Sequence, residues 1–159
     1  MGFTIRWETG PEWSGDNSLD DERHETLALW AADCAEHVLR LFEAERPDDD
    51  RPRTAIETVR EWQNGEVTVA EAREQSLAAQ AAARDASSTA ACEAARAAGH
   101  AVATVQVDRH AKSAANYAIK STVAANPTDE RAAEDEANWQ MGRLPSDLRA
   151  VMFLEEMGK

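Results

Sequence analysis

Side chains suited to chemistry recur at three- and four-residue spacings between positions 100 and 121. In a helix this spacing puts them on one face, where the imidazoles of His100 and His110 and the phenol of Tyr117 could form a polar pocket. Such a stripe also fits a core face whose few polar groups are hydrogen-bonded internally. Its members are His100, Ala103, Val107, His110, Ala114, Tyr117 and Ser121.

A second group, Asp33, Cys34 and His37, falls within about one helical turn, and His110 could join it from another helix. Zinc sites usually take closely spaced ligand pairs from two places, and the second pair is missing because position 106 is Gln. The two cysteines lack a nucleophile motif, and the sequence has no glycine-rich phosphate loop. We therefore predict no metal site, no cofactor, no catalytic residue and no enzymatic activity.

Carboxylates gather in three short segments, which are our candidate contacts for a partner. Their default interpretation is a solvated helix face, and the run at 48–53 also suits the positive end of a helix, with Arg53 reaching back to an acid. The candidate contact residues are Asp20, Asp21, Glu22, Glu25, Asp48, Asp49, Asp50, Asp129, Glu130, Glu134, Asp135 and Glu136.

The net charge limits the kinds of partner. Lys and Arg number 17 against 30 Asp and Glu, which gives −13 at pH 7. Residues 1–50 and 127–159 carry the excess acid, whereas residues 51–126 are nearly neutral. Such a field repels nucleic acid and anionic membranes and attracts a basic protein. With no export signal or apolar span, the chain is predicted to be soluble and cytoplasmic, with Cys34 and Cys92 as free buried thiols.

Helical periodicity and end signals predict the elements that position these side chains. Expected N-caps are Ser18, Asp50, Thr68 and Thr128, with Glu71 completing a capping box at Thr68. We expect a bend near Gly99, because one unbroken helix over 89–125 would be about 55 Å long. The predicted helices cover about 19–45, 52–63, 69–84, 89–125 and 129–143, with a last one opening at 145–146.

Composition alone points toward disorder, because Leu, Ile, Val and Phe together make up only 24 of the 159 residues. Alanine argues the other way: 32 residues are Ala, the strongest helix former. We predict an all-α fold, a single-domain Ala-rich helical bundle of five or six helices packed at short distances. Residues 1–17 would be an N-terminal strap or tail, and residues 18–159 the helical domain.

Four blocks and a short tail motif carry a resemblance to a known family. Arg51-Pro52-Arg53 and Gly99-His100 are their most distinctive parts. Through them the sequence resembles the putative immunity protein family of bacterial polymorphic toxin systems. The blocks are 27–39, 50–57 with Trp62, 94–104, and His110-Ala111 leading to Tyr117-Ala118, followed by Trp139-Gln140.

The resemblance implies a small helical protein that neutralises a cognate toxin. Immunity proteins occupy a toxin's active or substrate-binding surface, and acidic flanks would suit a basic toxin. We therefore expect a non-catalytic binding protein. The alternative is a helical small-molecule-binding or regulatory domain, and a third possibility is an acidic mimic of nucleic acid. The pocket of the alternative would be formed by Trp30, His37, Arg53, His100, His110 and Tyr117.

Overall fold

The computed structural model describes residues 21–149, and within them it is helical throughout, with no strand. The predicted all-α class is confirmed, but five or six helices was too few: a seventh begins at 146–149, at the edge of the described residues. The predicted strap at 1–17, Ser18 and Asp20 lie outside this range. The complete helices are α1 (Asp21–Glu45), α2 (Arg51–Gln63), α3 (Val69–Asp85), α4 (Thr89–Ala103), α5 (His110–Ala125) and α6 (Ala132–Arg143).

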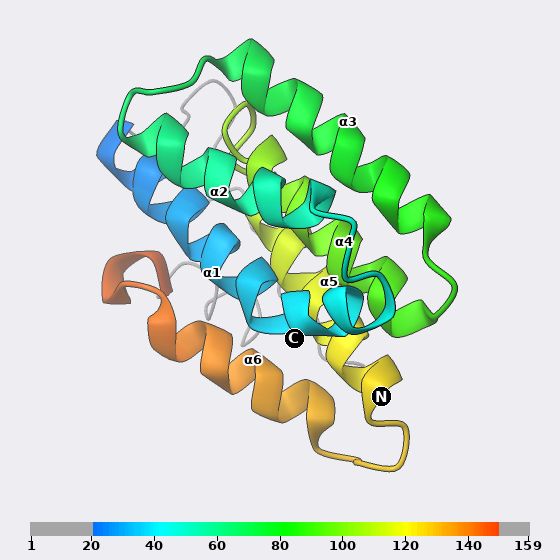
Figure 1. Ribbon diagram of the computed structural model, residues 1–159. Helices are drawn as coiled ribbons and strands as arrows, with labels where there is room; N and C mark the ends of the chain where they lie inside the picture. The colour runs from blue at the N-terminus through cyan, green and yellow to red at the C-terminus, as the bar shows by residue number, and fades with distance from the viewer. Residues whose placement is uncertain (1–20, 150–159) are drawn as a thin grey trace.

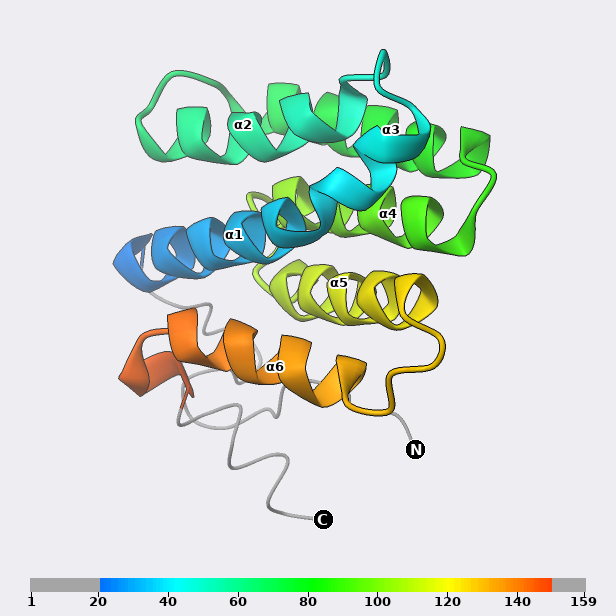
Figure 2. The ribbon, with the colours of Figure 1, turned by 60° about the horizontal axis from the view of Figure 1, so that its bottom comes forward.

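The helices stack in successive levels, which Figure 2 shows edge-on. Helices α2 and α3 lie at the top, α1 and α4 below them, then α5, and α6 at the bottom. Helix α4 is central, since it packs against α1, α2, α3 and α5 (Figure 1). Among the described residues, none of the helices is long and apolar enough to cross a membrane.

Of three predicted N-caps within the described residues, one is confirmed with its hydrogen bonds, one is confirmed in position only, and one is wrong. The Thr68 hydroxyl accepts from the Glu71 amide and the Glu71 carboxylate from the Thr68 amide, which completes the predicted capping box. Asp50 occupies the N-cap position of α2, but its side chain makes no capping hydrogen bond. Thr128 does not begin α6, because residues 126–131 form turns and the helix starts at Ala132.

The predicted bend at Gly99 was also wrong. The chain breaks instead at 104–109, between α4 and α5, and Gly99 lies inside α4. A Cβ on Gly99 would come within 2.5 Å of the Gln80 side-chain nitrogen on α3. Glycine therefore allows a close approach of the Gln80 side chain of α3 to the α4 backbone here, rather than a kink. The Ser76 hydroxyl donates to the Gly99 carbonyl at 3.1 Å, within the same contact.

Alanine forms the core around α4. The buried residues of this helix are mostly Ala, among them Ala94, Ala97, Ala98 and Ala101, each 0% exposed. Such small side chains let backbones come close enough for a hydroxyl to reach a neighbouring helix, as in the 2.7 Å bond from Ser121 on α5 to the Ala90 carbonyl. The larger core side chains come mainly from α1 and α2.

Candidate functional site

Helices α1 and α6 run antiparallel and are joined by long side chains rather than by Ala contacts (Figure 2). The Trp30 indole donates to the Gln140 backbone carbonyl at 2.8 Å, one of the last carbonyls of α6, which lack a partner within their own helix. The Gln140 side chain is fully buried and donates through Nε2 to the Ala115 carbonyl at 2.9 Å. Its Oε1 has no hydrogen-bond partner among the described residues.

A groove of about 330 Å³ opens on this junction. One wall holds His37, whose ring stacks on Trp139 with centroids 3.5 Å apart and planes 4° from parallel. His37 Nδ1 lies 2.8 Å from a carboxylate oxygen of Glu136, which is only 5% exposed. A carboxylate accepts, so Nδ1 carries the hydrogen, and in a neutral ring Nε2 is then the acceptor. The lining residues are Asp33, Glu36, His37, Trp139 and Arg143.

The other wall is a network of arginine and carboxylate side chains. Arg60 of α2 donates to Glu36 at 2.9 and 3.1 Å and to Asp33 at 3.1 Å. This hydrogen bonding lowers the pKa of Glu36 below its ordinary value. Arg143 stands 3.6 Å from the second oxygen of Asp33, and its guanidinium lies 5.1 Å from the centre of the Trp139 ring. The groove thus combines carboxylates, an imidazole ring and an aromatic surface.

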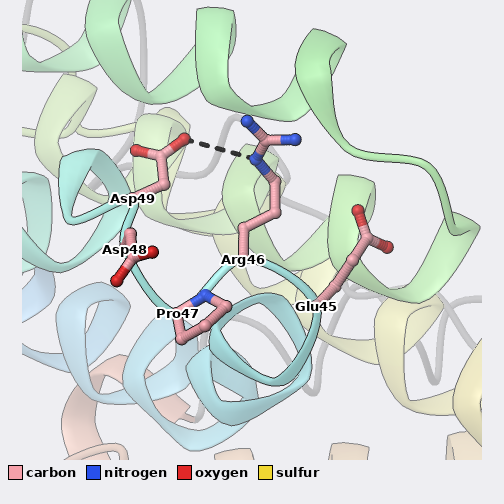
Figure 3. Close-up of a pocket in the computed structure, with 5 residues that line it drawn as sticks. All are labelled: Glu45, Arg46, Pro47, Asp48 and Asp49. Atoms are coloured by element: carbon pink, nitrogen blue, oxygen red, sulfur yellow. Dashed lines mark ion pairs between the residues drawn. The ribbon is translucent and has the colours of Figure 1, made fainter.

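A second hollow of about 460 Å³ lies at the corner between α1 and α2 (Figure 3). Except for Asp48, its charged side chains have partners within the protein. Arg46 pairs with Asp49 at 3.7 Å, drawn as the dashed line, and the Glu45 carboxylate accepts the Ser87 and Ser88 amides at 2.6 and 2.9 Å. Those amide hydrogen bonds lower the pKa of Glu45. Glu45 in this way fixes the turn that leads into α4, whose N-cap Ser88 accepts from the Ala91 amide through its own hydroxyl.

Arg51 closes this corner by joining two acids. It contacts Asp49 through two hydrogen bonds of 2.7 and 2.9 Å and Asp85 through one of 2.9 Å. The pKa of Asp49 is lowered mainly by its hydrogen bond to Arg51. Asp48 and Asp50 remain exposed and form no ion pair with another described residue.

His100 and His110 do come together, across the break between α4 and α5. Their Nδ1 atoms are 3.1 Å apart, so one ring donates and the other accepts, and Tyr117 stacks on His100 with centroids 5.1 Å apart. Burial, with smaller contributions from His110 and Arg96, lowers the pKa of His100 to about 4. Burial also lowers the pKa of His110. Val107, predicted on the same face, is 47% exposed in the connecting turn.

The six residues of the alternative pocket do not share one cavity. His100, His110 and Tyr117 form one cluster, whereas His37 lies in the α1–α6 groove and Trp30 is buried behind it. Arg53 reaches back to Glu43 with two hydrogen bonds of 2.6 and 2.7 Å, which agrees with the expected acid partner. The two histidines satisfy each other, so this geometry gives no support to a small-molecule pocket.

The candidate contact acids lie at separate places. Asp21, Glu22 and Glu25 begin α1, while Asp48 and its neighbours follow its other end, a helix length of about 37 Å away. The exposed acids of the third segment, Asp129, Glu130, Glu134 and Asp135, lie at the start of α6, the last two paired with Arg131. Glu136 must be removed from the set, because its carboxylate is buried against His37.

The described residues contain no cluster of three or more His, Cys, Asp or Glu side chains that could hold a metal ion. Asp33 and His37 face the α1–α6 groove, while Cys34 is fully buried, which raises its pKa well above the usual range of a thiol. Both cysteines are free, and Cys92 is half-buried.

Comparison with protein families gives a match over residues 17–147 to the family described as Imm-5 like putative immunity protein. The chain belongs to this family. The match spans α1 to α6 and contains the groove, the corner hollow and the histidine pair. No curated protein and no solved structure matches the chain.

For this Imm-5 like protein, sequence reasoning missed several members of the α1–α6 groove. Glu36, Trp139, Arg143 and the neighbouring Arg60 were not candidate site residues, although positions 136, 139 and 143 follow the three- and four-residue spacing of one helix face. That signal places the three side chains together on α6. It does not indicate that α1 faces them.

Proposed function

We propose that this protein neutralises a cognate bacterial toxin by binding it and covering its active or substrate-binding surface, without any catalytic step. Membership of the Imm-5 like family is the observation that carries the proposal. Occlusion requires a stable surface rather than a reactive residue, and the groove and hollow are consistent with this, because most of their charged groups have partners within the protein.

The charge distribution supports a basic partner. Exposed carboxylates such as Asp48, Asp50 and Glu130 form no ion pair with other described residues and add to a net charge of −13. Because these acids are spread over opposite ends of the bundle, we propose that they act together through their long-range field. Such a field accelerates the encounter with a positively charged toxin.

Co-expression tests the proposal directly. Candidate toxins are the products of genes adjacent to the one encoding this protein in its host. We expect one of them to stop growth when expressed alone, and growth to return when this protein is present, with a 1:1 complex recovered on purification. Failure to protect against any toxic neighbour would overturn the immunity function for this chain.

The electrostatic part has its own measurement. The association rate, followed by stopped flow at low and high salt, should fall roughly tenfold or more as salt screens the surface charges. The dissociation rate should change much less. A tight complex whose association rate is the same at both salt concentrations would contradict the role given to the acidic residues while leaving occlusion intact.

A further inference from the structure

The guanidinium of Arg143 is held loosely in the α1–α6 groove. Its contact with Asp33 is 3.6 Å long, and its side chain is 52% exposed on the last residue of α6. By comparison, Arg53 donates two hydrogen bonds to one carboxylate, at 2.6 and 2.7 Å, and Arg60 donates two to another, at 2.9 and 3.1 Å. Arg143 therefore occupies a favourable place for a cation without the short contacts that would fix it there.

That place has the features that recognise a guanidinium. The Trp139 ring offers its face, and the Asp33 carboxylate lies beside it. Glu36, 48% exposed, adds negative charge, and Nε2 of His37 is a hydrogen-bond acceptor when the ring is neutral. An aromatic face with adjacent acceptors suits arginine, because the planar guanidinium stacks and donates at the same time. The groove, at about 330 Å³, is large enough for one such side chain.

We infer that the α1–α6 groove is the docking site for an arginine side chain of the toxin, and that Arg143 is its placeholder in the free protein. On binding, the toxin's arginine displaces Arg143 toward solvent and takes its position against Trp139 and Asp33. The inference rests on the proposed function, and it agrees with a basic partner for a protein of charge −13. It places the specific contact at a half-buried aromatic group rather than at the dispersed acids.

Three variants test the groove by their dissociation constants with the toxin identified by co-expression. Removing the competitor in Arg143→Ala should tighten binding about 2- to 5-fold, the value of one exposed cation–π contact. Trp139→Leu should weaken binding roughly 30-fold or more, as expected of a central aromatic anchor. Asp33→Asn should also weaken binding.

Each variant has a matched control outside the groove. These are Arg53→Ala for Arg143→Ala, Trp62→Leu for Trp139→Leu, and Glu43→Gln for Asp33→Asn, and all three should leave the dissociation constant nearly unchanged. Circular dichroism and Tm, measured for every variant, show whether it is folded. Weaker binding by Arg143→Ala would overturn the placeholder role, because Arg143 itself would then contact the toxin. Protection by the wild type together with unchanged binding by all three groove variants would overturn the docking site and leave the immunity function standing.

A second measurement needs no toxin. In the Arg143→Ala protein, excess N-acetyl-arginine amide should shift the indole N–H resonance of Trp139 in a nitrogen-15 spectrum and leave that of Trp62 in place. N-acetyl-alanine amide is the control. If the arginine probe shifts neither resonance, or both equally, the groove does not recognise a guanidinium, whatever the co-expression result.

Discussion

The paired imidazoles of His100 and His110 should make this protein less stable as the pH falls from neutral toward about 4. Burial holds the pKa of His100 at about 4 in the folded protein, against 6.5 when the ring is exposed. Between those pH values the His100 ring is protonated in the unfolded chain but not in the folded protein. Its contribution to stability is therefore fully present above pH 6.5 and declines below it. A second proton would also set two N–H groups against each other at 3.1 Å.

The size of the effect follows from the same two pKa values. Their difference corresponds to at most about 3.4 kcal/mol. Because the His100 ring is only half-buried, solvent screens part of the penalty, and we expect about half of this, ~1.5 kcal/mol. For a chain of this length that is a fall in Tm of roughly 3–6 °C.

Urea unfolding at about pH 7.5 and about pH 4.5 measures the loss, and the slope with urea shows whether the transition stays two-state. The control is His100→Gln, whose amide can still exchange a hydrogen bond with His110 but cannot take up a proton. Its stability should vary less over the same range. If His100→Gln loses as much stability as the wild type, or if the wild type becomes more stable on acidification, the reasoning from the histidine pair is refuted.

Three further changes test the packing and capping. Gln140→Met should keep or raise the free energy of unfolding, measured in urea. The substitution removes one hydrogen bond worth about 1 kcal/mol, but it also removes a buried, unpartnered oxygen that costs about 1–3 kcal/mol. A large loss of stability would mean that this oxygen has a partner. Gly99→Ala should change Tm little, since the higher helix propensity of Ala offsets the displacement of the flexible Gln80 side chain. Gly99→Leu should destabilise by roughly 3 kcal/mol, because its larger side chain forces α3 and α4 apart. Equal effects of the two variants would contradict the close packing of Gln80 against Gly99. Thr68→Ala should cost about 1 kcal/mol and Glu71→Gln less, and no loss in thermal unfolding of Thr68→Ala would mean that the capping box does not stabilise α3.

The features that sequence reasoning located well are those set by neighbours along the chain. The capping box of Thr68 and Glu71 is such a feature, because its two hydrogen bonds join residues three apart. The extent of α2 is another, since the predicted range of about 52–63 differs by one residue from the observed Arg51–Gln63. Local geometry is sufficient to predict both.

The break between α4 and α5 depended on distant contacts. Gly99 had the stronger local signal for a bend, but the packing of Gln80 against it makes use of the missing side chain. At the start of the observed turn, 104–109, Nε2 of His24 lies 2.6 Å from the Thr104 carbonyl. His24 is eighty positions earlier in the sequence. Periodicity carries no information about either partner.

The candidate site shows the same division. His100, His110 and Tyr117 were placed together correctly, although for a reason that proved partly wrong, since they meet across a turn and not along one continuous helix. The α1–α6 groove could not be assembled from the sequence, because it exists only when α6 lies antiparallel to α1. Glu136 is an example. Its charge suggested an exposed residue, but the packing of α6 against α1 buries its carboxylate against His37.

The alanine core around α4 also restricts how a chain of this kind can diverge. In an ordinary core a larger residue can be accommodated by a smaller one opposite, but Ala facing Ala leaves no volume to exchange, and glycine would weaken the helix. Substitutions are better tolerated at the surface and where helices are held apart by long side chains, as at the junction of α1 with α6. If a toxin and its inhibitor change together, this junction is where new pairings can arise without disturbing the fold.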